Sequence, residues 1–185
     1  MAGHSSNPVP VFLISGCPGA GKSTVAAALM RRFEFGLHIP VDDLREWVVS
    51  GIAHPVPTWT DETTRQFTLA RESAVAMALR YQAAGFAIAI DDVIDRDALQ
   101  TYEPLLRDVH PMRVLLCPGE EVALARNDTR TGKNLDPKVL VEIIRKLSAV
   151  LRSQLAENPD WIVIDNGYLS IDETVDRILQ AMNVR

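Results

Sequence analysis

The segment Gly16-Cys-Pro-Gly-Ala-Gly-Lys-Ser23 matches the pattern G-x-x-x-x-G-K-[ST] of a phosphate-binding loop, or P-loop. Glycine is needed there because backbone N–H groups turn inward toward phosphate oxygens, where a Cβ atom has no room. Lys22 then supplies a cation for the β- and γ-phosphates, and the Ser23 hydroxyl is placed to bind Mg²⁺. A purely structural glycine turn is the alternative, but the motif directly follows the apolar run Val11–Ile14, as a P-loop requires. The residues expected to bind nucleotide are therefore Gly16, Cys17, Pro18, Gly19, Ala20, Gly21, Lys22, Ser23 and Thr24.

A pair of acids, Asp42 and Asp43, follows the second expected strand, and Arg45 comes shortly after them. Asp42 is positioned as a general base that accepts a proton from a substrate hydroxyl as its oxygen attacks the γ-phosphate. Arg45, three residues later, shares the helix face of Asp42. Helix N-capping is the alternative role, and we expect one of the two acids to fill it. Which of the two is the base stays open.

Further acids follow the third and fifth expected strands. Asp91 and Asp92 come after an apolar strand, where an acid in a P-loop protein commonly binds Mg²⁺ or its water. Asp91 is the better candidate by its place, and capping of the next turn is the alternative for both. Asp165 has no companion motif, so we interpret it as structural.

Two arginines, Arg126 and Arg130, stand four residues apart and are expected to project from one helix face. Guanidinium groups stay charged and offer forked donors, which suits the charge on a transferring phosphoryl group. Gly132 is expected to end this helix and let it close as a lid. A solvated surface turn, with Asp128 balancing the charge, is the alternative.

Short apolar runs alternate with longer amphipathic segments, which indicates an α/β fold. We predict a P-loop NTPase architecture, a three-layer α/β/α sandwich with a five-stranded parallel sheet and a short helical lid at about 119–133. Residues 1–9 are expected to form a flexible tail and residues 10–185 a single domain. The expected strands are Val11–Ser15, Leu37–Val41, Phe86–Ile90, Arg113–Cys117 and Trp161–Ile164. The expected helices are Lys22–Phe33, Asp43–Val49, Asp61–Ala84, Asp97–Arg107, Gly119–Arg130, Pro137–Ala156 and Asp172–Met182, the last with a capping box at Ser170 and Glu173.

An irregular insertion is expected at residues 50–60, because Pro55 and Pro57 prevent a regular element there. Trp59 in this insertion has two interpretations, a packing residue or part of the wall of an acceptor pocket.

Composition narrows the class of protein. The chain has 185 residues, 47% of them hydrophobic, and a formal net charge of −5, so a long nucleic acid is an unexpected partner. No membrane span or signal peptide is recognised, which predicts a cytoplasmic protein. Cys17 and Cys117 are too few for a disulfide framework, and redox activity of Cys17 stays open, as does the oligomeric state.

Taken together, Gly16–Thr24, the Asp-Asp-Leu-Arg unit at 42–45, Asp91 and the Arg-Asn-x-x-Arg-x-Gly unit at 126–132 resemble one family. These are the AAA-like P-loop kinases that include polynucleotide kinase, chloramphenicol phosphotransferase and the zeta toxins. The resemblance implies Asp42 as base, Arg45 as the arginine that holds the acceptor, and Arg130 as the lid arginine with Arg126 beside it. It also implies ATP or GTP with Mg²⁺ as donor. Leu44 replaces the tyrosine of the polynucleotide kinase branch.

The leading hypothesis is therefore an ATP- and Mg²⁺-dependent kinase that phosphorylates a hydroxyl of a small molecule. A polynucleotide or nucleoside 5′-hydroxyl kinase is one alternative. A nucleotide-dependent regulatory ATPase is another. The acceptor and the choice between ATP and GTP are not fixed by the sequence.

Overall fold

The computed structural model describes residues 9–128, 137–155 and 158–183. Its centre is a five-stranded parallel sheet in the order β2-β3-β1-β4-β5. The strands are β1 (Val11–Ser15), β2 (Gly36–Pro40), β3 (Ala87–Asp91), β4 (Met112–Leu116) and β5 (Trp161–Ile164). Every residue of β1 and β3 is buried, as expected for parallel strands covered on both faces.

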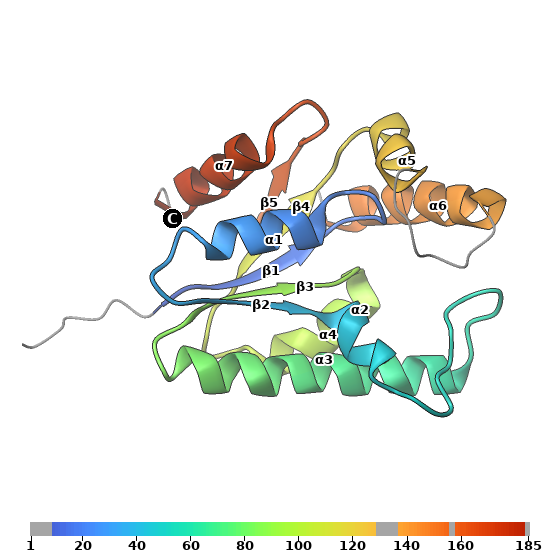
Figure 1. Cartoon of the computed structure of the whole chain (residues 1–185), viewed down its shortest axis with the longest axis horizontal. Coiled ribbons are helices and arrows are strands. Elements are labelled where there is room, and N and C mark those ends of the chain that lie inside the picture. Colours follow the sequence, from blue (N-terminus) through green and yellow to red (C-terminus); the bar gives the residue numbers. More distant parts are fainter. Residues whose placement is uncertain (1–8, 129–136, 156–157, 184–185) are drawn as a thin grey trace, which may run out of the picture.

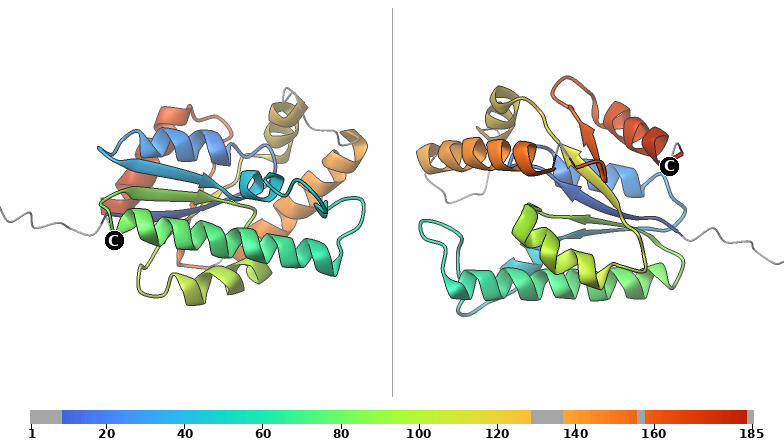
Figure 2. Two further views of the ribbon diagram at one scale, coloured as in Figure 1. Left: turned by 60° about the horizontal axis from the view of Figure 1, so that its bottom comes forward. Right: turned by 180° about the vertical axis from the view of Figure 1, so that it is seen from behind.

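Helices cover both faces of the sheet and give the molecule three layers (Figures 1 and 2). Helices α1 (Lys22–Met30) and α7 (Ile171–Asn183) pack on one face, and α3 (Asp61–Gln82) and α4 (Arg96–Leu105) on the other. The short α2 (Val41–Glu46), with α5 (Glu120–Asp128) and α6 (Pro137–Leu155), lies toward the carboxyl ends of the strands. This arrangement confirms the predicted α/β class and three-layer architecture.

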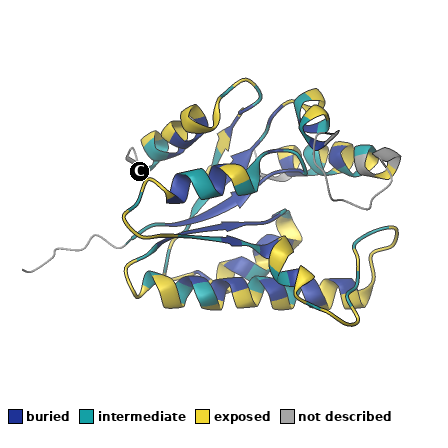
Figure 3. Ribbon diagram, in the orientation of Figure 1, coloured by how far each residue is buried: buried dark blue, intermediate teal, exposed yellow. Residues whose placement is uncertain are grey.

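Successive side chains of β1 point to opposite faces of the sheet, so the core has two halves. Phe12 and Ile14 join the cluster under α1 and α7, whereas Val11 and Leu13 join the cluster under α3 and α4. Ala87 and Ala89 of β3 face α1 and are fully buried, so small side chains let this helix lie close to the sheet. Figure 3 shows buried strands between helices whose outer faces are exposed.

Most predicted boundaries are correct within a few residues, and the capping box of α7 is confirmed. Ser170 N donates to Glu173 Oε2 at 2.8 Å, and Glu173 N donates to Ser170 Oγ at 3.2 Å. The prediction that Asp42 or Asp43 caps its helix is wrong. Helix α2 begins at Val41 with Pro40 at the N-cap, so both acids occupy the first turn and neither makes a side-chain cap. Their carboxylates instead lie beside the positive end of the helix dipole.

Within the described ranges, no helix is both long and apolar enough to cross a membrane. The tail expected at residues 1–9 falls almost entirely outside the described residues, as does the part of the expected lid between 129 and 133.

Candidate active site

The P-loop connects β1 to α1 and takes a conformation that requires glycine. Gly19 has φ +83°, and a Cβ atom built there would lie 2.2 Å from the carbonyl oxygen of Ala123 in α5. Gly21 has φ +91° and directly precedes α1. Lys22 Nζ donates to the carbonyl oxygen of Gly16 at 3.0 Å, so the ammonium group lies over the loop. The loop therefore has the open backbone and the cation that phosphate binding needs.

Ser23 and Asp91 lie together beside the P-loop, although 68 residues separate them in sequence. Ser23 Oγ donates to Asp91 Oδ1 at 3.3 Å, and Asp91 Oδ2 is within hydrogen-bond distance of His38 Nε2 in β2. A hydroxyl and a carboxylate are hard oxygen ligands of the kind that Mg²⁺ takes together with phosphate oxygens and water. The donor set thus fits the Mg²⁺ that the sequence predicts.

A small cavity of about 180 Å³ opens beside Gly21 and Thr24, on the α7 side of the P-loop. Arg126 and Asn166 also line it, with Leu169, Ile171 and Thr174. Asn166 Nδ2 donates to the P-loop carbonyl of Ala20 at 2.9 Å, while its buried Oδ1 has no partner in the part of the chain that the structure describes. Asn166 thus supports the backbone of the P-loop where the loop meets this cavity.

Arg126 lies in α5 and reaches the segment after β5. Its Nη2 donates to the carbonyl oxygens of Asn166 at 3.0 Å and Gly167 at 3.3 Å. Arg130 and Gly132 lie outside the described residues, so the phosphate-binding role and the closing lid stay predictions. Asp165 accepts from Gly167 N at 3.0 Å and makes a local turn.

The acceptor side of the site contains a buried arginine. Asp42 and Asp43 are exposed at the start of α2, but Arg45 is only 6% exposed and its Nη2 donates to Ala53 O at 2.8 Å. Arg45 Nε is buried without a hydrogen-bond partner, and none of the ion pairs found in the described ranges includes this residue. Burial lowers the pKa of the guanidinium, while the charges of Asp42 and Asp92 raise it in part.

The ring of Phe67 in α3 supports this arginine. Arg45 Cζ lies 3.9 Å from the centroid of the Phe67 ring, and Trp59 stacks on the same ring at 5.0 Å with an interplanar angle of 15°. The indole of Trp59 is itself 53% exposed, so one wall of this region is an accessible aromatic surface.

Gln66 attaches the irregular insertion to α3. Its Nε2 donates to Gly51 O at 2.8 Å, and its Oε1 accepts from Ala53 N at 2.9 Å. Because Arg45 also binds Ala53, the base of the insertion is fixed both to α2 and to α3.

Behind Phe67, a buried network joins α3, α4 and the end of β3. Asp92 Oδ2 accepts from Arg71 Nε at 2.7 Å and from the Tyr102 hydroxyl at 3.1 Å. Burial lowers the pKa of Arg71, but the charge and hydrogen bond of Asp92, together with Tyr102 and Asp95, raise it above its ordinary value.

The structure thus brings the P-loop, Ser23 and Asp91 together at the carboxyl end of the sheet, with Asp42 and Arg45 nearby. Asp42 lies two residues after Pro40, which is the register partner of Asp91. Four residues of this region are absent from the predicted set: His38, Phe67, Arg71 and Asn166. The four-residue spacing of Phe67 and Arg71 could have indicated that these two side chains lie together, since it places both on one helix face.

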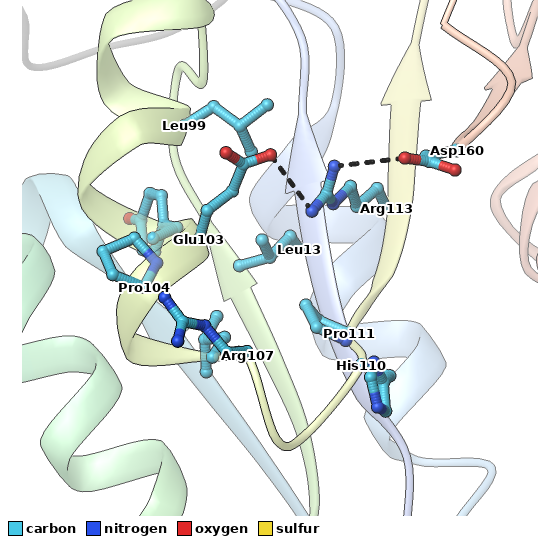
Figure 4. Close-up of a pocket in the computed structure, with 11 residues that line it drawn as sticks. Leu13, Leu99, Glu103, Pro104, Arg107, His110, Pro111, Arg113 and Asp160 are labelled. Atoms are coloured by element: carbon cyan, nitrogen blue, oxygen red, sulfur yellow. Dashed lines mark ion pairs between the residues drawn. The ribbon is translucent and has the colours of Figure 1, made fainter.

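A larger cavity, of about 680 Å³, lies away from this site between α4 and the amino end of β4 (Figure 4). There Arg113 pairs with Glu103 at 3.3 Å and with Asp160 at 3.7 Å. No residue of the P-loop lines this larger cavity, and neither Asp42 nor Asp91 does. We therefore place the candidate active site at the carboxyl edge of the sheet instead.

Comparison with known proteins identifies the family and the fold. A family model described as an AAA domain matches residues 11–152. No curated protein sequence matches the chain significantly.

Solved structures with the same fold include a gluconokinase from Sinorhizobium meliloti 1021, with 17% identity and a TM-score of 0.64 over 96% of this chain and 93% of that one. A tunicamycin resistance protein from Deinococcus radiodurans has 16% identity and a TM-score of 0.65, covering 94% of this chain and 95% of that one. Shikimate kinase from Acinetobacter baumannii, in complex with shikimate, has 16% identity and a TM-score of 0.65, covering 95% of this chain and 94% of that one.

Proposed function

Since the chain belongs to the AAA domain family, we propose that it is a kinase that uses ATP and Mg²⁺ to phosphorylate a hydroxyl of a small molecule. The observation that carries this proposal is Arg45, a buried guanidinium without an ionic partner among the described residues, three residues after Asp42. A buried charge is normally paired, so an arginine left without an ionic partner at the start of the insertion favours a second ligand that pairs with it. A kinase needs such a second half-site, whereas an ATPase that only hydrolyses nucleotide does not.

The donor half would be bound by the P-loop. Its backbone N–H groups and Lys22 would hold the phosphates, and the cavity lined by Arg126 and Asn166 would take the base, with ATP as the preferred donor and GTP as the alternative. Ser23 and Asp91 would hold Mg²⁺, which supplies positive charge to the transferring phosphoryl group. Arg130 is the proposed lid arginine that adds to this charge.

In the acceptor half, Asp42 is the proposed base. The charge of Asp42 raises the pKa of the Arg45 guanidinium against the effect of burial, as do the charges of Asp92 and Glu46. In α2, Asp42 stands three residues before Arg45 and shares its helix face, whereas Asp43 stands two residues before Arg45 and does not. This asymmetry is the reason to prefer Asp42.

The proposed reaction is an in-line transfer. The acceptor oxygen forms a bond to the γ-phosphorus, the bond from that phosphorus to the β–γ bridging oxygen breaks, and ADP leaves. The hydroxyl proton passes to the Asp42 carboxylate. Most of the acceleration would come from positioning and from charge stabilisation.

The names of the solved relatives support a small-molecule acceptor, since they include a gluconokinase and a shikimate kinase. The net charge of −5 also argues against a long nucleic acid.

The test is an incubation with γ-labelled ATP, Mg²⁺ and an acceptor panel of sugars, sugar acids, antibiotics, nucleosides and short oligonucleotides. Label on a small molecule, absent with Lys22→Ala, supports the proposal. Label on an oligonucleotide favours the polynucleotide kinase alternative instead. Release of free phosphate alone, unchanged by any acceptor, favours the regulatory ATPase.

Paired variants then test the base. Asp42→Asn should lower kcat by about a thousandfold with little change in ATP affinity, which is the size of effect expected when a general base is removed. Asp43→Asn is the matched control and should retain most activity. Equal losses in the two variants would exclude the assignment of Asp42.

A further inference from the structure

A buried ion pair between Arg71 and Asp92 joins α3 to the end of β3. Asp92 Oδ2 accepts from Arg71 Nε and from the Tyr102 hydroxyl, and its Oδ1 accepts from Val93 N at 2.7 Å. The side chains of Arg71 and Asp92 are 12% and 1% exposed. The carboxylate is thus fixed by α3, by α4 and by its own backbone.

This contact also fixes the preceding residue, Asp91. The backbone N–H of Asp92 donates to Ile14 O at 3.2 Å, and Ile14 is the register partner of Asp91. Beyond this bond the β3 ladder ends, so the side-chain contacts of Asp92 hold the chain where it leaves the sheet. Ser23 and His38 contact the Asp91 carboxylate directly, and Asp92 fixes the backbone from which that carboxylate projects.

Arg71 also contacts Phe67, which lies one helical turn earlier in α3. Arg71 Cζ lies 5.2 Å from the Phe67 ring centroid, and Arg45 Cζ lies 3.9 Å from the same point. Phe67 is only 7% exposed, so its ring orientation is set by these neighbours. Arg71 therefore helps to place the guanidinium of Arg45.

We propose that the Arg71–Asp92 ion pair is a positioning device that sets the Mg²⁺ ligand Asp91 and the acceptor arginine Arg45 relative to each other. The roles of Asp91 and Arg45 rest on the proposed function. Arg71 and Asp92 are positioning residues, because they act through Asp91 and Phe67 and not on the reacting atoms. The pair connects the donor half of the site to the acceptor half through contacts shorter than 5.5 Å.

The alternative is that the pair only attaches α3 to the sheet. Removal of a purely structural ion pair lowers the fraction of folded protein. It therefore weakens ATP binding equally with and without Mg²⁺. A positioning pair has a different effect, because its loss weakens Mg²⁺-dependent binding and leaves metal-free nucleotide binding intact.

The first experiment compares Arg71→Met with Arg65→Met, a matched control on the same helix whose exposed arginine pairs with Glu62. ATP affinity is measured by calorimetry with Mg²⁺ and again with EDTA, after circular dichroism confirms folding. Arg71→Met should weaken Mg·ATP binding by about tenfold and metal-free ATP binding by less than about twofold. Arg65→Met should change neither value.

This readout needs no acceptor, so it separates the two proposals. If the unmutated chain phosphorylates nothing in the panel but the selective Mg·ATP loss appears, the proposed function fails and the positioning of Asp91 is supported. If an acceptor is found, its KM should also rise about tenfold in Arg71→Met, through Phe67 and Arg45.

Equal loss with and without Mg²⁺, or no loss at all, would overturn the proposal. If Arg71→Met does not fold, Arg71→Lys is judged by the same criterion, because it keeps the charge and loses the Nε donor.

Discussion

The contact between Gly19 of the P-loop and α5 allows a prediction whose magnitude follows from the structure. Gly19→Ala introduces a Cβ atom 2.2 Å from the Ala123 carbonyl oxygen, at a residue with φ +83°. The left-handed backbone costs roughly 1–2 kcal/mol for a residue with a Cβ. Relief of the overlap requires the loop or α5 to move by roughly 1 Å, which adds about 1–3 kcal/mol.

Gly51→Ala is the matched control. Gly51 has φ +78°, but a Cβ there would meet no atom within 4 Å. We expect Gly51→Ala to lower the free energy of unfolding by about 1–2 kcal/mol and to leave ATP affinity unchanged. Gly19→Ala should lower the free energy of unfolding by about 2–5 kcal/mol and weaken ATP binding by at least about tenfold.

The assay combines urea unfolding, followed by circular dichroism, with calorimetric titration of ATP. If Gly19→Ala and Gly51→Ala lose the same stability, and both bind ATP normally, the P-loop does not depend on the contact with α5.

Three further predictions concern single side chains. Hydrogen bonds from Arg65 and Gln66 lower the pKa of Glu62 from 4.5 to about 2, so its stabilising effect is present above about pH 4.5 and is lost as the pH falls toward 2. Glu62→Gln should therefore flatten the pH dependence of Tm in that window, measured by differential scanning fluorimetry; an unchanged slope would exclude the effect. Gln66→Leu removes two of the hydrogen bonds that attach the insertion to α3 and should cost about 2 kcal/mol in urea unfolding. Hydrogen exchange in residues 51–53 should rise, and unchanged exchange would contradict the role of Gln66. Asn166→Leu leaves the Ala20 carbonyl unpaired and should weaken ATP binding by about tenfold, whereas equal affinity by calorimetry would show that Asn166 does not support the P-loop.

The fold was predictable because its signals are local. Apolar runs of strand length alternate with amphipathic segments, and the P-loop identifies the apolar run before it as the first strand in the chain. The helix after β2 was misplaced by about two residues. Asp at 42 and 43 is a good capping residue, but the turn after Pro40 starts the helix at Val41, before either acid.

The contacts of the candidate site were less predictable, because they depend on register and on helix placement. His38 meets Asp91 only because β2 pairs with β3 so that Pro40 lies opposite Asp91, and one sequence does not give that register. Arg71 carries no motif, and its pairing with Asp92 follows from the angle at which α3 crosses the sheet. The roles predicted for Asp42, Arg45 and Asp91 stay predictions.

The way the insertion is attached bears on how this scaffold could change its acceptor. The bonds from Arg45 and Gln66 reach the backbone atoms of Gly51 and Ala53, not their side chains. Side chains at residues 54–58 can therefore be exchanged without loss of those anchors, whereas Trp59 is kept because it stacks on Phe67 and donates to Thr64 Oγ1. The segment is suited to saturation mutagenesis, in which acceptor range diverges while the P-loop, the sheet and the attachment to α3 stay constant.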